Sequence, residues 1–184
     1  MLALAGTALA QAPAPAGVYR LEPARAKVLF TVNRFGLSAF RGQFAGASGA
    51  LVLDRSNIAA SHLEVSVPVA SVATDSRRMD ALLAGPGWFD AARYPSITFR
   101  STAVSPTGPA SAEVAGDLTL HGVTRRVTFE VKFDYAGDDG HGSTAGFEAW
   151  GRIRRSQYGI ARYAFLVGDT VELTIKAGFT HASD

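Results

Sequence analysis

The chain has 184 residues, of which 47% are hydrophobic and 18% charged, with no cysteine and a formal net charge of +2. This length fits one domain with a sizeable core, and the apolar content excludes a disordered chain. The lack of cysteine excludes disulfides and thiolate metal sites, and the small net charge does not favour nucleic acid as a partner. No apolar run is long enough for a membrane-spanning helix.

The N-terminus has the features of a secretory signal. Residues 1–10, MLALAGTALA, form a short apolar stretch with a small-x-small pattern at Ala8–Ala10, although a basic n-region is missing. An ordinary alanine-rich terminus is the alternative. Residues 11–17 are rich in proline and alanine and predict a flexible linker. We therefore expect a signal-peptide remnant over 1–10, a single domain over 18–180, and export of the mature protein.

Alternating apolar and polar residues dominate the first third of the domain. Because side chains alternate between two faces along a strand, this pattern predicts half-buried strands. Glycines within them predict bulges or bends of the kind that curl a sheet into a barrel. No Gly-Lys-Ser/Thr follows these glycines, which excludes a phosphate-binding loop. The strands are predicted at 18–21, 27–32, 40–44, 46–54 and 61–67.

Residues 74–83 change to helical spacing. Thr74 and Asp75 are candidate caps at the start of this segment, and the Gly-Pro-Gly sequence at 85–87 ends it. A compact turn over 88–94 follows and ends before a proline. We expect the short helix and this turn to cover one end of the sheet.

The second half returns to the alternating pattern of strands. Four connections interrupt it, namely a loop at 105–109, a tight turn at 121–124, a polar loop at 137–143 and a longer connection over 156–166. In the turn, Gly122 supplies the positive φ that a tight hairpin needs. About eight antiparallel strands predict an all-β sandwich or barrel, and the one-sided alternation favours a barrel. These strands are predicted at 96–104, 114–120, 127–133, 144–154 and 170–179.

Six segments in a fixed order carry a family resemblance. They are VNRFGLSAFRGQF (32–44), GALVLD (49–54), WFDAARYPSITFR (88–100), GDLTLHGVTRRV (116–127), FEAWGRIRRSQYGI (147–160) and GDTVELTI (168–175). Together they resemble the YceI-like family of exported lipid- and polyisoprenoid-binding proteins, and the resemblance covers residues 18–179. It implies an extended eight-stranded antiparallel β-barrel of lipocalin-like type, a long apolar cavity for an isoprenoid or similar amphiphile, and a periplasmic location.

The chain departs from the family pattern at three positions. Family members often carry histidine where Arg34 and Leu82 stand here, and proline where Arg126 stands. A polar role toward a ligand head group is therefore not expected at Leu82, whereas Arg34 keeps or strengthens one.

Inward-facing apolar side chains either fill the barrel or line a cavity, and alternation alone does not distinguish the two. The resemblance favours a cavity with few polar groups. At its mouth we expect head-group donors at Arg34 and Arg41, then Tyr158 and Arg162, with solvated surface arginine as the alternative. The predicted lining is Phe30, Val32, Phe35, Leu37, Phe40, Phe44, Leu51, Phe99, Leu118, Phe129, Val131, Phe147, Leu173 and Ile175.

No catalytic pattern is present. Histidines 62, 121, 141 and 181 lack metal-ligand spacing and are expected on the surface, and no GxSxG is found. Asp138 and Asp139 lie in a glycine-rich loop and predict a solvated turn. We expect no enzyme activity, no cofactor and no metal. The basic run of Arg152, Arg154 and Arg155 predicts a solvated face or a weak contact with an anionic membrane.

Three hypotheses for function result. The first is a non-enzymatic periplasmic carrier or store for a long-chain isoprenoid or related amphiphilic lipid, such as a polyprenyl phosphate, a quinone or a fatty amide, with peripheral membrane contact. The second is a lipid-modifying enzyme. The third is a filled barrel that acts as a structural or stress-response interaction module, as a homodimer through an edge strand.

Overall fold

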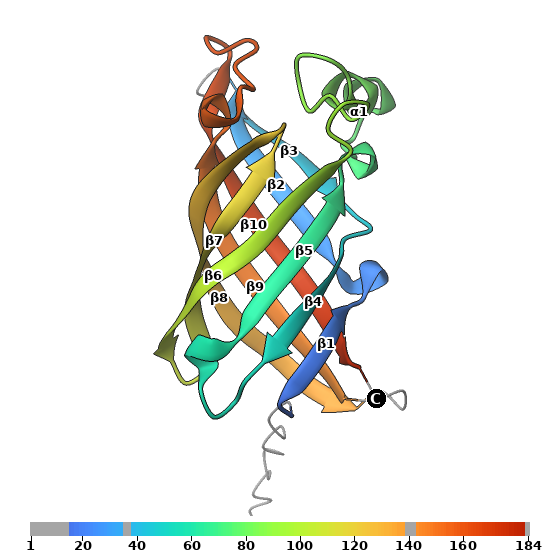
Figure 1. Ribbon diagram of the computed structural model, residues 1–184. Coiled ribbons are helices and arrows are strands. Elements are labelled where there is room, and N and C mark those ends of the chain that lie inside the picture. The colour runs from blue at the N-terminus through green and yellow to red at the C-terminus, as the bar shows by residue number, and fades with distance from the viewer. Residues whose placement is uncertain (1–14, 35–37, 139–142, 183–184) are drawn as a thin grey trace, which may run out of the picture.

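A computed structural model describes residues 15–34, 38–138 and 143–182 (Figure 1). Within these ranges the chain forms ten strands and one α-helix, α1 (Arg77–Ala84). The strands are β1 (Gly17–Leu21), β2 (Lys27–Arg34), β3 (Ser38–Phe44), β4 (Ser48–Leu53), β5 (His62–Pro68), β6 (Ser96–Gly108), β7 (Ser111–Leu120), β8 (Val123–Asp138), β9 (Ser143–Arg154) and β10 (Val167–His181).

The strands form a closed antiparallel barrel in the order β1-β4-β5-β6-β7-β8-β9-β10, because β1 also pairs with β10. The strands β1 and β2 follow one another along the same edge of β10, with Leu21 opposite Phe179 and Phe30 opposite Leu173. A short 3-10 turn, η1 (Pro23–Arg25), separates them. In the same way, β4 pairs with β1 and β3 pairs with β2, so that β4 and β3 together form one position in the wall. With each interrupted pair counted once, the described chain is an eight-stranded barrel, which confirms the predicted fold class.

The two faces of the wall differ as the alternating pattern predicts. Inward residues of β7, such as Leu118 and Leu120, are buried. The outer face carries ion pairs between neighbouring strands, each of which contributes at most about 1 kcal/mol because it is exposed to water. These pairs are Arg100–Glu64, Arg126–Asp117, Arg152–Glu172 and Lys176–Glu148, with N···O distances of 3.0, 3.1, 3.2 and 2.8 Å.

The predicted helix is present, but its cap is Ser76. The Ser76 side chain accepts a hydrogen bond from the Met79 N–H at 3.4 Å. The predictions of Thr74 and Asp75 as caps were wrong. Thr74 donates both its backbone N–H and its hydroxyl to the Asp80 carboxylate in the first turn of α1, at 2.6 and 2.7 Å, and does not accept from a free N–H of the helix.

Three predicted connections are shorter in the structure. In the predicted polar loop at 137–143, Gly137 and Asp138 belong to β8 and Ser143 to β9, so that Asp138 is paired in a strand and not in the predicted turn. Residues 105–108 continue β6 and pair with β7, where a loop was predicted. The prediction missed this part of the strand because residues 105–108, at the end of the β6–β7 hairpin, are all exposed and show no apolar alternation. The hairpin turn between β7 and β8 contains only His121 and Gly122, which have φ of 52° and 73°. Two positive φ values define the turn whose twist matches that of the adjoining strands.

The sequence predicted bulges or sharp bends at the glycines of 46–54, and no bulge is present in β4. β4 pairs with β5 in unbroken register from Ser48 to Val52, and Gly49 allows close approach to the Glu64 carbonyl. The irregular positions lie in β6, β8 and β10.

Inside the barrel, glycines make room for phenylalanine rings of the neighbouring strand. A Cβ on Gly116 or Gly151 would lie 2.5 Å from the facing ring, which is closer than carbon atoms can pack. Each ring therefore occupies the space of a missing side chain, so that it lies against the wall. The pairs are Phe30 over Gly42, Phe99 over Gly116 and Phe129 over Gly151.

Candidate functional site

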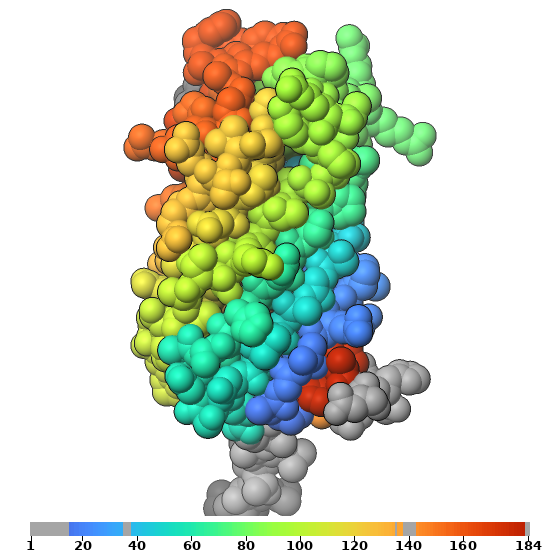
Figure 2. Space-filling view, viewed as in Figure 1, coloured from blue at the N-terminus to red at the C-terminus, as the bar shows by residue number. Residues whose placement is uncertain are grey.

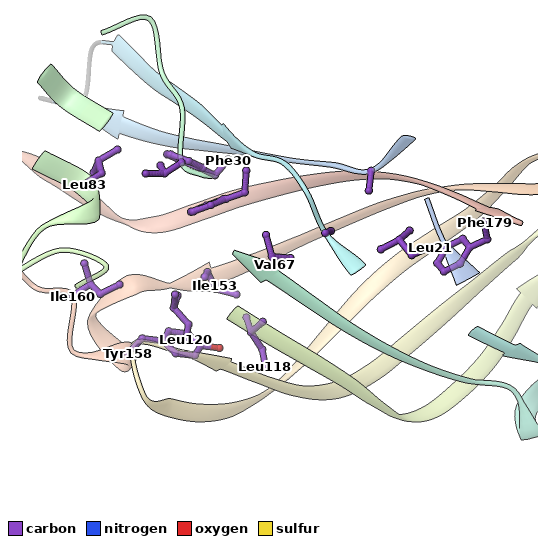
Figure 3. Close-up of a cluster of buried hydrophobic side chains, with 14 of the residues drawn as sticks. Leu21, Phe30, Val67, Leu83, Leu118, Leu120, Ile153, Tyr158, Ile160 and Phe179 are labelled. Atoms are coloured by element: carbon purple, nitrogen blue, oxygen red, sulfur yellow. The ribbon is translucent and has the colours of Figure 1, made fainter. Parts of the chain in front are cut away.

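The barrel encloses an apolar cavity of about 820 Å³. Figure 3 shows apolar side chains from several strands directed toward the interior, among them Phe30, Val67 and Leu118. All the predicted lining residues that the structure describes lie on the cavity wall, and Phe35 and Leu37 fall outside the described residues. Those on the wall are Phe30, Val32, Phe40, Phe44, Leu51, Phe99, Leu118, Phe129, Val131, Phe147, Leu173 and Ile175.

Several inward side chains are partly exposed, which shows that the interior of the barrel is not filled. Phe99, Val131 and Leu173 face inward but are only half-buried, because they do not meet partners across the lumen. The rings that lie over glycines keep part of the aromatic volume against the wall. An eight-stranded barrel is just wide enough to be filled by its side chains or to hold one ligand, and here the side chains leave internal space.

Aromatic contacts stabilise the wall at successive positions along the barrel. Edge-on or tilted ring pairs of this kind contribute about 0.5–1.5 kcal/mol each beyond their buried area. One cluster joins Phe30, Phe40, Phe44 and Phe89, and the separate pair Phe99–Phe129 has ring centroids 5.3 Å apart. Toward the other end, Phe147 packs on both Phe133 and Phe179, at 5.5 and 5.8 Å.

One end of the barrel is covered by two segments, α1 with the turn that follows it and residues 155–166 (Figure 1). The first cover was predicted and is confirmed, whereas residues 155–166 were expected only as a connection. The covers meet where the Trp88 and Tyr163 rings lie 6.2 Å apart and where Arg162 lies over Gly87. Met79, Leu83, Trp88 and Phe89 extend the cavity lining beneath them.

His121 links these two covers and is not the plain surface histidine that the sequence predicted. Its ring packs edge-on against Tyr94 of the first cover, with centroids 4.7 Å apart, and its Nδ1 is 3.0 Å from the Tyr158 carbonyl oxygen of the second. His181 also packs, edge-on against the buried Tyr19 at 5.0 Å, whereas His62 is exposed. His141 lies outside the described residues.

Arg155 was predicted to be part of a solvated basic run, and this was wrong, because only 6% of it is exposed. Its guanidinium donates to four backbone carbonyls, those of Ile160, Arg162, Val167 and Gly168, at 2.7–2.9 Å. Burial lowers the pKa of Arg155, and the Asp169 carboxylate opposes that shift. The side chain therefore holds the second cover in shape.

The pKa of Asp169 is also lowered, but here the main cause is hydrogen bonding. The Ser156 N–H and hydroxyl both donate to its carboxylate at 2.9 Å, and these hydrogen bonds lower the pKa of Asp169 because they favour the ionised form. The pair joins the start of the second cover to the start of β10.

The four candidate head-group residues are not brought together. Arg34 lies on the cavity wall at the end of β2, whereas Arg41 is exposed on the outer face of β3. Arg162 is exposed on the second cover, with its Cζ 5.3 Å from the Tyr163 ring centroid. Tyr158 is only 1% exposed, and burial raises the pKa of its hydroxyl.

The described interior has few unpaired polar groups. Among the described residues, Trp88 Nε1 and the Tyr158 hydroxyl are the buried side-chain atoms without a hydrogen-bond partner. The same part of the chain holds no group of three or more histidine, aspartate or glutamate side chains placed to bind a metal ion. None of its helices is both long and apolar enough to cross a membrane. Asp139 is not described.

Comparison with known proteins places the chain in a family. The YceI-like domain matches residues 19–179. The chain belongs to the YceI-like family. It is 35% identical over 162 residues to a UPF0312 protein of Pseudomonas putida (strain W619), covering 86% of this chain and 84% of that protein. It is 37% identical over 140 residues to Protein YceI of Escherichia coli O157:H7, covering 76% and 73%.

Solved structures share the barrel. The chain is similar to Burkholderia cenocepacia BcnA, with a TM-score of 0.78 and 26% identity, over 86% of this chain and 98% of that one. A polyisoprenoid binding domain from Saccharophagus degradans, implicated in plant cell wall breakdown, matches with a TM-score of 0.67 over 91% and 100%. At 13% identity this second likeness shows a common fold.

Proposed function

We propose that this protein is a non-enzymatic carrier that holds a long-chain isoprenoid lipid or related amphiphile in its barrel. A polyprenyl phosphate, a quinone and a fatty amide are the candidate ligands. The observation that carries the proposal is the apolar cavity of about 820 Å³, a size typical of sites for small molecules. The membership in the YceI-like family supports it.

Burial of the tail supplies the binding energy. Each buried methylene contributes about 0.8 kcal/mol, so that ten of them contribute about 8 kcal/mol before the cost of ordering the chain. The wall carries aromatic and aliphatic side chains that accept any apolar tail, and specificity then follows from tail length. For the head group, Arg34 is the predicted donor that lies on the cavity wall.

The cavity counts against a filled-barrel interaction module, since such a module needs no internal space. A lipid-modifying enzyme would need a residue whose loss abolishes turnover while binding survives. The Saccharophagus domain is named for polyisoprenoid binding, which supports the idea that this fold accommodates such a tail. A homodimer through an edge strand stays a prediction.

We place the carrier in the periplasm on the signal-like character of residues 1–10. A periplasmic carrier must exchange its cargo with a membrane, because a long prenyl chain is insoluble in water.

Native mass spectrometry of the protein purified from its own periplasm tests the proposal, followed by solvent extraction of bound material. A discrete added mass that extracts as a prenyl chain, quinone or fatty amide is the expected result. Val131→Trp, on the cavity wall, should lose that mass, whereas Lys132→Trp, on the exposed outer face of the same strand, should keep it. A bare protein mass after gentle purification, together with no saturable binding of long-chain amphiphiles, would refute the carrier.

A further inference from the structure

Three of the six large apolar side chains that are exposed among the described residues lie on the two covers of the barrel, and they include the most exposed one. Phe165 is 82% exposed, Tyr163 44% and Leu82 42%. Tyr163 and Leu82 also line the cavity, so that the apolar surface continues from the interior onto this rim. Figure 2 shows residues 155–166, in orange, beside the green segment that contains α1 at this end. We call Leu82, Tyr163 and Phe165 the mouth patch.

Four exposed arginines lie on the two covers that carry the mouth patch. Arg77 and Arg78 are exposed on α1, Arg93 is exposed on the turn after it, and Arg162 is exposed next to Tyr163. None of these four has a carboxylate partner among the described residues, whereas three arginines of the outer wall, Arg100, Arg126 and Arg152, are paired with glutamate or aspartate. The rim therefore presents unpaired positive charge around exposed aromatic and aliphatic groups.

We infer that this end of the barrel docks on an anionic phospholipid bilayer, with the mouth patch in the interfacial region and the arginines on lipid phosphates. The inference rests on the proposed function, because a cargo with a long apolar tail is exchanged with least cost when the cavity opens onto the membrane. Aromatic side chains favour the membrane interface, and arginine binds phosphate with a planar fork of donors.

A second copy of the chain fits this surface less well. A two-fold dimer places the same patch of both copies face to face, so that the arginines of one would oppose those of the other. An anionic bilayer instead meets the positive rim with the opposite charge, and basic residues are attracted to it within about a Debye length.

Co-sedimentation of the full-length protein with vesicles tests the inference, with phosphatidylethanolamine–phosphatidylglycerol vesicles compared with pure phosphatidylcholine. The protein should bind the anionic vesicles more tightly, and salt should weaken the binding. Phe165→Ser should weaken it about tenfold, from the loss of one buried aromatic side chain. Arg77→Gln with Arg78→Gln should weaken it about 25-fold, from about fivefold for each charge.

Matched controls lie at the opposite end, where Val18 is 45% exposed and Arg20 is exposed on β1. Val18→Ser and Arg20→Gln should leave vesicle binding unchanged, and equal losses in the controls would overturn the assigned surface. Phe165→Ser should still bind a short prenyl phosphate in solution. If the unaltered protein binds that ligand but not the vesicles, docking is refuted and the carrier stands. A dimer in solution that Phe165→Ser dissociates would assign the mouth patch to a second copy instead.

Discussion

Replacement of Gly151 by alanine should push the Phe129 ring away from the wall and into the cavity. The added Cβ would lie 2.5 Å from Phe129 Cδ1 and 2.7 Å from Cε1, whereas carbon atoms pack at about 3.5–4.0 Å. The ring must therefore move by about 1 Å, and overpacking of this kind costs about 1–3 kcal/mol.

Two further contributions partly offset one another. The displaced ring loses its edge-on contact with Phe99, which is worth about 0.5–1.5 kcal/mol. Alanine restricts the unfolded chain more than glycine does, which stabilises the folded state by about 0.4–1 kcal/mol. Because the neighbouring cavity lets the ring swing inward, the expected net loss in the free energy of unfolding is about 1–2 kcal/mol. The swung ring narrows the lumen, and binding of long tails should weaken as well.

Urea unfolding measures this change as a lower midpoint with an unchanged slope. Gly137→Ala is the matched control, because its Cβ would meet only the Thr144 hydroxyl oxygen at 3.9 Å, and it should be neutral or slightly stabilising. In a Phe129→Leu background the ring is gone, and Gly151→Ala should cost at least about 1 kcal/mol less than it does alone. Equal costs in the two backgrounds, or an alanine variant as stable as the parent, would refute the role assigned to this pair.

Three other outcomes are expected. Asp169→Asn should destabilise the protein near neutral pH, because hydrogen bonds from Ser156 lower the pKa of this carboxyl in the folded state. The ionised carboxylate stabilises the folded protein above about pH 4, and this effect is lost as pH falls through the folded-state pKa. The difference between the variant and the parent should therefore shrink in acid-unfolding curves. Gly122→Ala should cost about 1–3 kcal/mol in urea unfolding, since φ is +73° there and a Cβ would meet the Tyr94 ring. Arg155→Lys should lower the free energy of unfolding by at least about 2 kcal/mol, because it leaves several backbone carbonyls without a donor, and a near-neutral result would contradict the structural role given to that guanidinium.

Local patterns predicted the wall well. The alternation around Leu118 and Phe129 is set by the strand period of two, so that inward and outward residues follow from sequence order alone. The hairpin turn at Gly122 and the helix over 77–84 also depend on neighbouring residues, which is why both were found. The alternation did not predict the strand over 105–108, because these residues are all exposed and have no apolar face to alternate with a polar one.

The covers of the barrel depended on distant contacts. Arg155 lies beside two other arginines in the sequence, and only the folding of residues 160–168 around it supplies the carbonyls that allow its burial. His121 has no distinctive spacing, yet Tyr94 and Tyr158 approach it from two different segments. The mouth patch, similarly, is assembled from α1 and a segment about eighty residues later.

Short-range periodicity was enough to predict most of the strands with their inner and outer faces, and six motifs in order were enough to predict the family. Whether the barrel is filled or hollow was decided by the tertiary structure. The same inward phenylalanines would fill the lumen if their rings pointed to the axis. Here Phe30, Phe99 and Phe129 lie over glycines of the adjacent strands, and that cross-strand packing leaves about 820 Å³ free.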